Sequence, residues 1–162
     1  MSSAPSVPAL VLGGLVGASI LALGLAFFVQ YGLGYAPCPL CVLARWPHVA
    51  VIAIGVVALL SGAERAGLLL AMFALLVAFA ISLRHAGVEA GSLALPGACA
   101  GVAPASDLDG LRSAILLQNQ PSCGVPGPSV LGLSMAVWHA LGALGLATIA
   151  ATGLMVARGR RS

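Results

Sequence analysis

Four long apolar stretches divide the chain, with shorter or more polar segments between them. They run from about 8 to 31, 42 to 60, 66 to 83 and 130 to 156. A helix needs roughly 20 mainly apolar residues to cross the hydrocarbon core of a bilayer. The pattern therefore predicts an all-α fold, an integral membrane four-helix bundle that forms one domain over residues 1–162.

The segments between the stretches differ in length. The turn from Ser61 to Arg65 is so short that the second and third helices must be antiparallel neighbours. The first loop covers about 32–41, and the second, about 86–128, is the only long polar stretch. Loops of that length are commonly functional.

The long loop carries a signal for a short helix. Ser106-Asp-Leu-Asp109 resembles a capping box, and Leu108, Leu111 and Ile115 follow at helical spacing. We expect an amphipathic helix at about 107–118. Its apolar side could lie on the bilayer surface or pack on the bundle.

Composition strengthens the assignment to the membrane. Hydrophobic residues make up 60% of the chain and charged residues 7%, and the mean hydropathy is +1.11. The net charge of +3 rests on arginines alone, and no basic run suits a nucleic-acid partner. No charged residue precedes Arg45, so the start of the chain lacks the basic region of a signal peptide, and we expect the first helix to be retained.

The placement of arginine predicts the orientation. With both termini on one side, that side holds Arg65, Arg158, Arg160 and Arg161, whereas the loops opposite hold Arg112. Basic residues are retained on the cytoplasmic side. We therefore expect cytoplasmic termini in a bacterial inner membrane, with all four cysteines on the periplasmic side, where disulfides persist.

The cysteines supply the candidate chemistry. Cys38 and Cys41 form a Cys-Pro-Leu-Cys motif at the start of the second helix, and Cys99 and Cys123 lie in the long loop. Small apolar packing residues are one interpretation of such cysteines. A four-cysteine zinc site is another, but only one pair has the short spacing that zinc sites use, so we expect no metal. Two disulfides, one in each loop, fit better, and a bond that closes only two intervening residues is more useful for redox chemistry than for stability.

Arg45 lies about one helical turn inside the membrane. An arginine there either snorkels to water or has a function, such as donating hydrogen bonds to a quinone carbonyl. We expect His48, three positions further on, to be a packing residue, and His139 to make a hydrogen bond between helices. His85 belongs to an interfacial polar cluster with Glu89. We expect none of the three histidines to be a proton donor, although His85 is the best placed of them.

These motifs together resemble the disulfide bond formation protein B (DsbB) family. The resemblance covers nearly the whole chain: the four helices, Cys-Pro-Leu-Cys, the Arg45-Trp-Pro-His48 segment, the His85-Ala-Gly-Val-Glu89 segment and the loop cysteines. It implies a thiol:quinone oxidoreductase that reoxidises a DsbA-like periplasmic protein of the thioredoxin fold, with ubiquinone or menaquinone as the cofactor. The chain departs from the family after Cys123, where Gly124-Val-Pro-Gly-Pro128 replaces the usual acidic residue and tryptophan.

The resemblance also implies a role for each cysteine. Cys99 would be attacked by the partner's thiolate, which frees Cys123, and Cys123 would then attack the Cys38–Cys41 disulfide at Cys38. Cys41 would pass the electrons to a quinone beside Arg45. Partners of this enzyme would be the DsbA-like protein and membrane lipid.

Two other functions fit parts of the pattern. A non-enzymatic membrane scaffold would use the disulfides only to fasten its outer loops. An enzyme similar to vitamin K epoxide reductase also has two cysteine pairs in a small helical bundle, but there the quinone-side Cys-x-x-Cys lies late in the chain. Here it opens the second helix.

Overall fold

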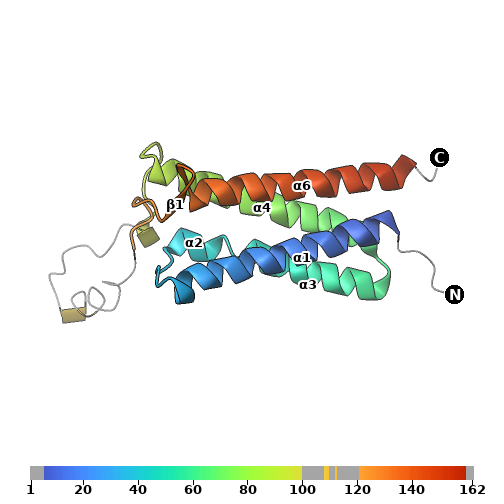
Figure 1. Cartoon of the computed structure of the whole chain (residues 1–162), viewed down its shortest axis with the longest axis horizontal. Helices are drawn as coiled ribbons and strands as arrows, with labels where there is room; N and C mark the ends of the chain where they lie inside the picture. The colour runs from blue at the N-terminus through green and yellow to red at the C-terminus, as the bar shows by residue number, and fades with distance from the viewer. Residues whose placement is uncertain (1–5, 100–107, 110–111, 113–120, 160–162) are drawn as a thin grey trace.

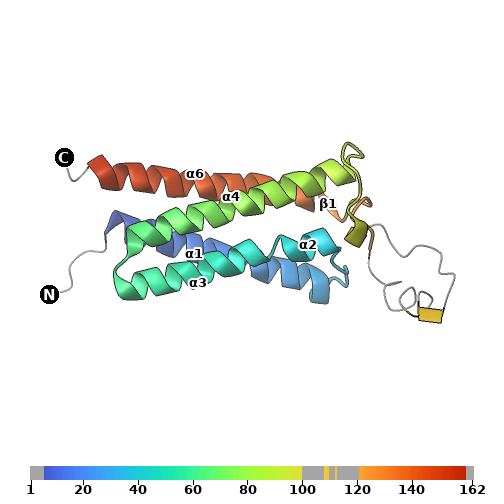
Figure 2. The ribbon, with the colours of Figure 1, turned by 180° about the vertical axis from the view of Figure 1, so that it is seen from behind.

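The computed structural model describes residues 6–99, 108–109, 112 and 121–159. Four long helices lie side by side along the longest axis of the molecule (Figures 1 and 2). They are α1 (Val7–Phe27), α3 (Trp46–Ser61), α4 (Glu64–Glu89) and α6 (Met135–Gly159). With the short helices that flank them, all four are long and apolar enough to cross a membrane. A mostly helical architecture with four long apolar helices that could cross a membrane is confirmed for this part of the chain.

The first span begins with an ordinary cap and ends with an unusual turn. The Ser6 side chain accepts a hydrogen bond from the Ala9 amide at 3.2 Å, and Pro8 occupies the first turn, where a missing N–H costs nothing. Beyond Phe27 the chain continues as a π-helix, η1 (Phe28–Gly32). Gln30, in this wider turn, lies beside Arg45 of the second span.

A break divides the second span into α2 (Pro39–Leu43) and α3. Pro47 has no amide hydrogen to donate to the Leu43 carbonyl, and its ring would collide with that carbonyl in a continuous helix. The chain therefore passes through Ala44 and Arg45 in a tighter turn, with the Arg45 amide bonded to Val42 O at 3.1 Å. This span starts at Pro39 rather than at 42, and the break was not predicted.

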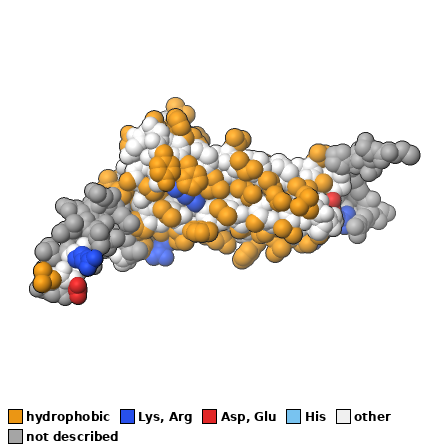
Figure 3. Space-filling model, turned by 90° about the horizontal axis from the view of Figure 1, so that it is seen from below, with side chains coloured by type: hydrophobic (Ala, Val, Ile, Leu, Met, Phe, Trp, Pro, Cys, Tyr) orange, Lys and Arg blue, Asp and Glu red, His pale blue; other side chains and the backbone are white. Residues whose placement is uncertain are grey.

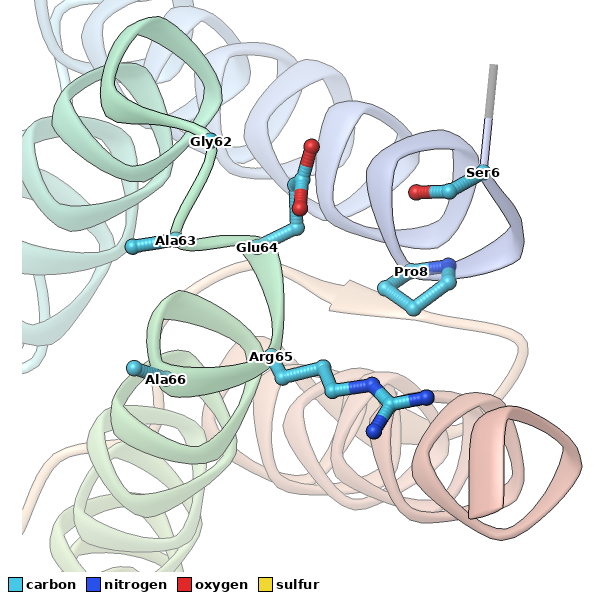
Figure 4. A pocket seen from close by; sticks show the side chains of 7 residues that line it. All are labelled: Ser6, Pro8, Gly62, Ala63, Glu64, Arg65 and Ala66. Carbon is cyan, nitrogen blue, oxygen red and sulfur yellow. The ribbon is translucent and has the colours of Figure 1, made fainter. Parts of the chain in front are cut away.

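At the other end of the bundle, α3 stops at Gly62, whose φ of 71° favours glycine. The predicted short turn into α4 is present. The turn and the start of α1 surround a cavity of about 280 Å³ (Figure 4). Arg65 lies beside it and donates a hydrogen bond to the Ala157 carbonyl, which ties α4 to the last turn of α6. The start of α1 and the end of α6 lie at this same end (Figure 1).

The bundle core is built from leucines set between small residues. Buried Leu12, Leu15, Leu68 and Leu75 pack with Val51 and several alanines. Small side chains let membrane helices approach closely. A Cβ added to Gly67 would overlap Ala58 Cβ on α3, so the α3–α4 approach depends on this glycine. On the face seen in Figure 3, exposed hydrophobic side chains are spread along the length of the bundle.

Two further predicted helix boundaries differ from those in the structure. Helix α4 runs from Glu64 to Glu89 instead of ending at 83, so the first residues assigned to the long loop are helical. Polar residues such as Arg84 mark where the apolar environment ends, but a helix can continue into water. The last helix begins at Met135 rather than 130, because Ser129–Val130 (β1) and Leu133–Ser134 (β2) form a hairpin around Leu131 and Gly132, both with positive φ.

The loop at the cysteine end is described in part. A short 3-10 helix, η2 (Gly97–Cys99), carries the first loop cysteine, and the chain resumes at residue 121 shortly before the second. The amphipathic helix expected at 107–118 falls almost wholly outside the described residues.

Candidate redox site

The Cys-Pro-Leu-Cys motif forms the first turn of α2. Cys38 is the cap of this helix: its Sγ accepts a hydrogen bond from the Cys41 amide at 3.2 Å. The same turn brings Cys38 Sγ and Cys41 Sγ within 2.8 Å of each other. The two cysteines are free and in hydrogen-bond contact. The motif is thus held in a geometry from which a disulfide can close.

The loop cysteines form a disulfide that packs on this motif. Cys99 and Cys123 are bonded to each other, as the sequence led us to expect for a pair within one loop. They share one buried cluster with Cys38, Leu40 and Val88, and Cys41 packs against its edge. Cys38, Cys99 and Cys123 are at most 5% exposed, whereas Cys41 is only half-buried. Both pairs therefore meet at one site, and Cys41 is its most open member.

His85 is the histidine of this site. Its Nε2 lies 3.5 Å from Cys38 Sγ and also 3.5 Å from Glu89 Oε1, one helical turn further along α4. The sequence placed His85 and Glu89 in one polar cluster, which the structure confirms, but it gave no contact with Cys38. The signal in the sequence was the spacing of His85 and Glu89, because residues i and i+4 lie on one face of a helix, and this helix continues past residue 83.

The surroundings of Cys38 favour its thiolate. The Cys41 thiol, which donates its hydrogen to Cys38 Sγ, is the largest influence, and it lowers the pKa of Cys38 from 9.0 to about 4. Burial opposes the shift, and His85 adds to it through its hydrogen bond and its charge. A thiolate is the nucleophile in disulfide exchange, so Cys38 is the activated sulfur of the pair.

Arg45 is held at the break between α2 and α3. Its Nη1 donates a hydrogen bond to Gln30 Oε1 at 2.7 Å, and its guanidinium carbon lies 5.0 Å from the centre of the Phe27 ring. Both partners belong to the end of the first span. The guanidinium is thus engaged within the protein rather than reaching freely into water, and snorkelling alone does not describe it.

The other two histidines lie deeper and take no part in this cluster. His48 Nδ1 contacts Ser19 Oγ at 3.2 Å, and His48 Nε2 contacts His139 Nε2 at 2.8 Å. His139 Nδ1 is hydrogen-bonded to Ser82 Oγ. This polar network joins all four long helices and confirms the predicted interhelical hydrogen bond of His139. His48, expected to be an interfacial or packing residue, is a buried member of the same network.

Two cysteine pairs in one buried cluster, at the end of four apolar helices, define a membrane-embedded thiol–disulfide redox protein. Comparison with known proteins narrows this class. The family model of the disulfide bond formation protein DsbB matches residues 8–153. The chain therefore belongs to the DsbB family, quinone-dependent oxidoreductases that reoxidise DsbA.

Individual relatives agree with this assignment. The chain is 38% identical to disulfide bond formation protein B 1 of Pseudomonas putida and 35% identical to disulfide bond formation protein B of Pseudomonas syringae pathovar tomato. Each alignment covers 80% of this chain and 78% of the relative. An uncharacterised protein of Rickettsia prowazekii is 29% identical over 78% of this chain and 76% of its own length. No solved structure gives a significant match.

Proposed function

We propose that this chain takes electrons from a DsbA-like periplasmic protein of the thioredoxin fold and passes them through its two cysteine pairs to a membrane quinone, ubiquinone or menaquinone. The observation that carries the proposal is the shared cluster of the Cys99–Cys123 disulfide, Cys38 and Cys41. A scaffold would need its disulfides only to fasten loops. Packing one pair against the other is what a relay of thiol–disulfide exchange requires.

The electrons would enter at the loop. The partner's thiolate attacks Cys99 and forms a mixed disulfide, and Cys123 leaves as a thiolate. Cys99 is only 3% exposed, so this attack requires the loop to lift away from α2. Closure of the partner's own disulfide then releases Cys99, and both partner thiols have been oxidised.

The electrons would next cross to the motif on α2. Cys123 attacks the Cys38–Cys41 disulfide at Cys38, and Cys41 leaves as a thiolate. Attack by Cys99 on the resulting Cys38–Cys123 bond restores the loop disulfide and releases Cys38. The arrangement of one loop disulfide and two thiols on α2 corresponds to the state after this step.

The surroundings of Cys41 and Arg45 fit a lipophilic carbonyl compound. Among the described residues, Gln30 takes one guanidinium donor of Arg45, and no other side chain is hydrogen-bonded to the rest, which can bond a carbonyl oxygen. Trp46, the next residue along the chain, is 64% exposed, and Tyr31, whose ring stacks on that of Phe27, is 76% exposed, which supports entry from the lipid. A bound quinone supplies the acceptor for two electrons and two protons, which leave as Cys38 and Cys41 close their disulfide.

In this scheme His85 is a positioning residue. It contacts Cys38 and holds the thiolate that forms when the interloop bond is resolved. We further propose that residues 1–162 act as one domain in a bacterial inner membrane, with cytoplasmic termini and periplasmic cysteines. The common end of α1 and α6, which also holds Arg65, supports this orientation.

The test is quinol production in membranes that contain the protein, a reduced DsbA-like partner and quinone. Replacing each cysteine by serine in turn should abolish turnover. Cys41→Ser should accept one pair of electrons into the loop cysteines and then stop, because Cys38 is left without a disulfide for Cys123 to attack, whereas Cys99→Ser should leave the partner reduced. Full quinol production by Cys41→Ser would refute the proposal.

Arg45→Gln offers a sharper test of the quinone site, with Arg65→Gln at the opposite end of the bundle as the matched control. We expect Arg45→Gln to raise the KM for quinone and to leave reduction of the loop disulfide by the partner unchanged. Equal effects of the two substitutions would place the quinone elsewhere.

A further inference from the structure

The reduced redox site also presents the donor set of a transition-metal site. Cys38 Sγ, Cys41 Sγ and His85 Nε2 all lie within 4.8 Å of one another. Two sulfurs and one imidazole nitrogen are ligands that zinc accepts, whereas calcium and magnesium require oxygen. The three side chains come from α2 and α4, so helix packing has already brought them together.

A fourth donor adjoins this set. The Glu89 side chain is 8% exposed, and its Oε1 lies 3.5 Å from the same His85 nitrogen that faces Cys38. Its Oε2 is buried and has no hydrogen-bond partner among the described residues. A buried carboxylate oxygen without a partner is costly, and a cation is one of the few ways to satisfy it.

The distances suit zinc with a small adjustment. With Zn–S near 2.3 Å and Zn–N near 2.0 Å, a tetrahedral site separates sulfur from nitrogen by about 3.5 Å and two sulfurs by about 3.8 Å. The observed Cys38 Sγ–His85 Nε2 distance is 3.5 Å. The two sulfurs, now 2.8 Å apart, would open by about 1 Å, and the half-buried Cys41 has room to turn.

We propose that the reduced form of this protein binds Zn²⁺ through Cys38, Cys41 and His85, with Glu89 as the fourth ligand. Each cysteine binds as a thiolate, any thiol proton is released to solvent, and no electron is transferred. A Cys38–Cys41 disulfide offers no thiolate, so the oxidised protein binds no metal. Zinc bound in this way holds both sulfurs and blocks their oxidation, so the site makes the reduced enzyme sensitive to zinc.

This inference goes beyond the proposed function, because it needs the two free cysteines but neither partner nor quinone. Zn²⁺ has no useful absorption, so the probe is Co²⁺, added to the purified, detergent-solubilised protein after reduction by a phosphine. Tetrahedral thiolate coordination should produce sulfur-to-cobalt charge-transfer bands and intense visible bands. Added Zn²⁺ should abolish both, and Ca²⁺ or Mg²⁺ should not.

Five comparisons decide the outcome. The oxidised protein should show no bands. The Cys99→Ser/Cys123→Ser variant, whose only remaining cysteines are Cys38 and Cys41, should retain them. Glu89→Gln and His85→Ala should each lower the Co²⁺ affinity by about 10- to 100-fold. Glu64→Gln, a carboxylate at the far end of the bundle, should leave it unchanged.

Equal affinity in wild type, His85→Ala and Glu89→Gln would overturn the site, since it would show that cobalt binds to any accessible thiol. Bands of the weak octahedral type would also overturn it. Neither result bears on the proposed relay, which is measured separately as quinol production. Conversely, loss of quinol production with intact cobalt bands would count against the relay alone.

Discussion

The polar network beneath the redox site can be tested by removing its central residue. His139→Leu deletes two contacts between helices, one to His48 on α3 and one to Ser82 on α4. Hydrogen bonds between membrane helices are worth about 0.6 kcal/mol on average and at most about 1.7. We therefore expect His139→Leu to lower the free energy of unfolding by about 1 to 3 kcal/mol.

The two contacts should not contribute equally. Ser82 Oγ also donates to the Ala78 carbonyl at 2.8 Å, so it keeps a partner when His139 is lost. His48 Nε2 has only His139 among the described contacts. A double-mutant cycle between His48→Leu and His139→Leu should give a coupling near 1 kcal/mol, whereas the Ser82→Ala cycle should give less.

The assay is unfolding in mixed detergent micelles by titration with SDS, followed by circular dichroism. Thr148→Val on the same helix is the control, because its hydroxyl bonds only to Gly145 O within α6. Additive effects of His48→Leu and His139→Leu would refute the network as a link between helices. A loss for Thr148→Val equal to that for His139→Leu would show that the change in polarity, not the contact, is being measured.

Three further predictions concern Gly67 at a contact between helices, the ionisation of Cys38 and the backbone of Leu131. Gly67→Ala should lower the free energy of unfolding by about 1 to 3 kcal/mol in the same titration, because its Cβ overlaps Ala58. Gly145→Ala has open space around it and should instead stabilise its helix by about 0.5 to 1 kcal/mol. Equal effects would contradict the close approach of α3 and α4. The pKa of Cys38 in the folded protein is about 4 instead of 9.0. Its rate of alkylation by iodoacetamide in metal-free buffer, followed by mass spectrometry, should therefore stay level from pH 8 to pH 5 and fall only near pH 4. A tenfold fall per pH unit from pH 8 downward would show an ordinary thiol. Leu131 has a φ of 52° and is 88% exposed, so Leu131→Asn should raise the stability by about 1 kcal/mol; a loss would mean that detergent or lipid covers this leucine.

Local patterns in the sequence predicted much of the fold and part of the site. Apolar length identified the four spans, and spacing identified the cysteine pairs, because both depend only on neighbours along the chain. The contact between His85 and Cys38 depends instead on how α4 packs against α2, 47 positions away. No local pattern reports that packing.

The same dependence on packing explains why the sequence did not predict the partners of Arg45 or the ends of the helices. The sequence placed Arg45 inside the membrane, but its partners Gln30 and Phe27 follow from a π-helical turn that hydropathy does not reveal. Hydropathy likewise ended the third helix at 83, because it detects the edge of the apolar layer. The remaining turns to Glu89 are polar, and they carry the residues that meet the cysteines.

The extension of α4 past the apolar layer gives the site its chemistry. Had the helix ended at 83, His85 and Glu89 would lie in the loop and move with it each time a partner opened the Cys99–Cys123 disulfide. In the proposed relay, His85 and Glu89 would instead stay on the helix while the loop moves. Cys38 would therefore keep its contact with His85 while the loop disulfide opens and closes.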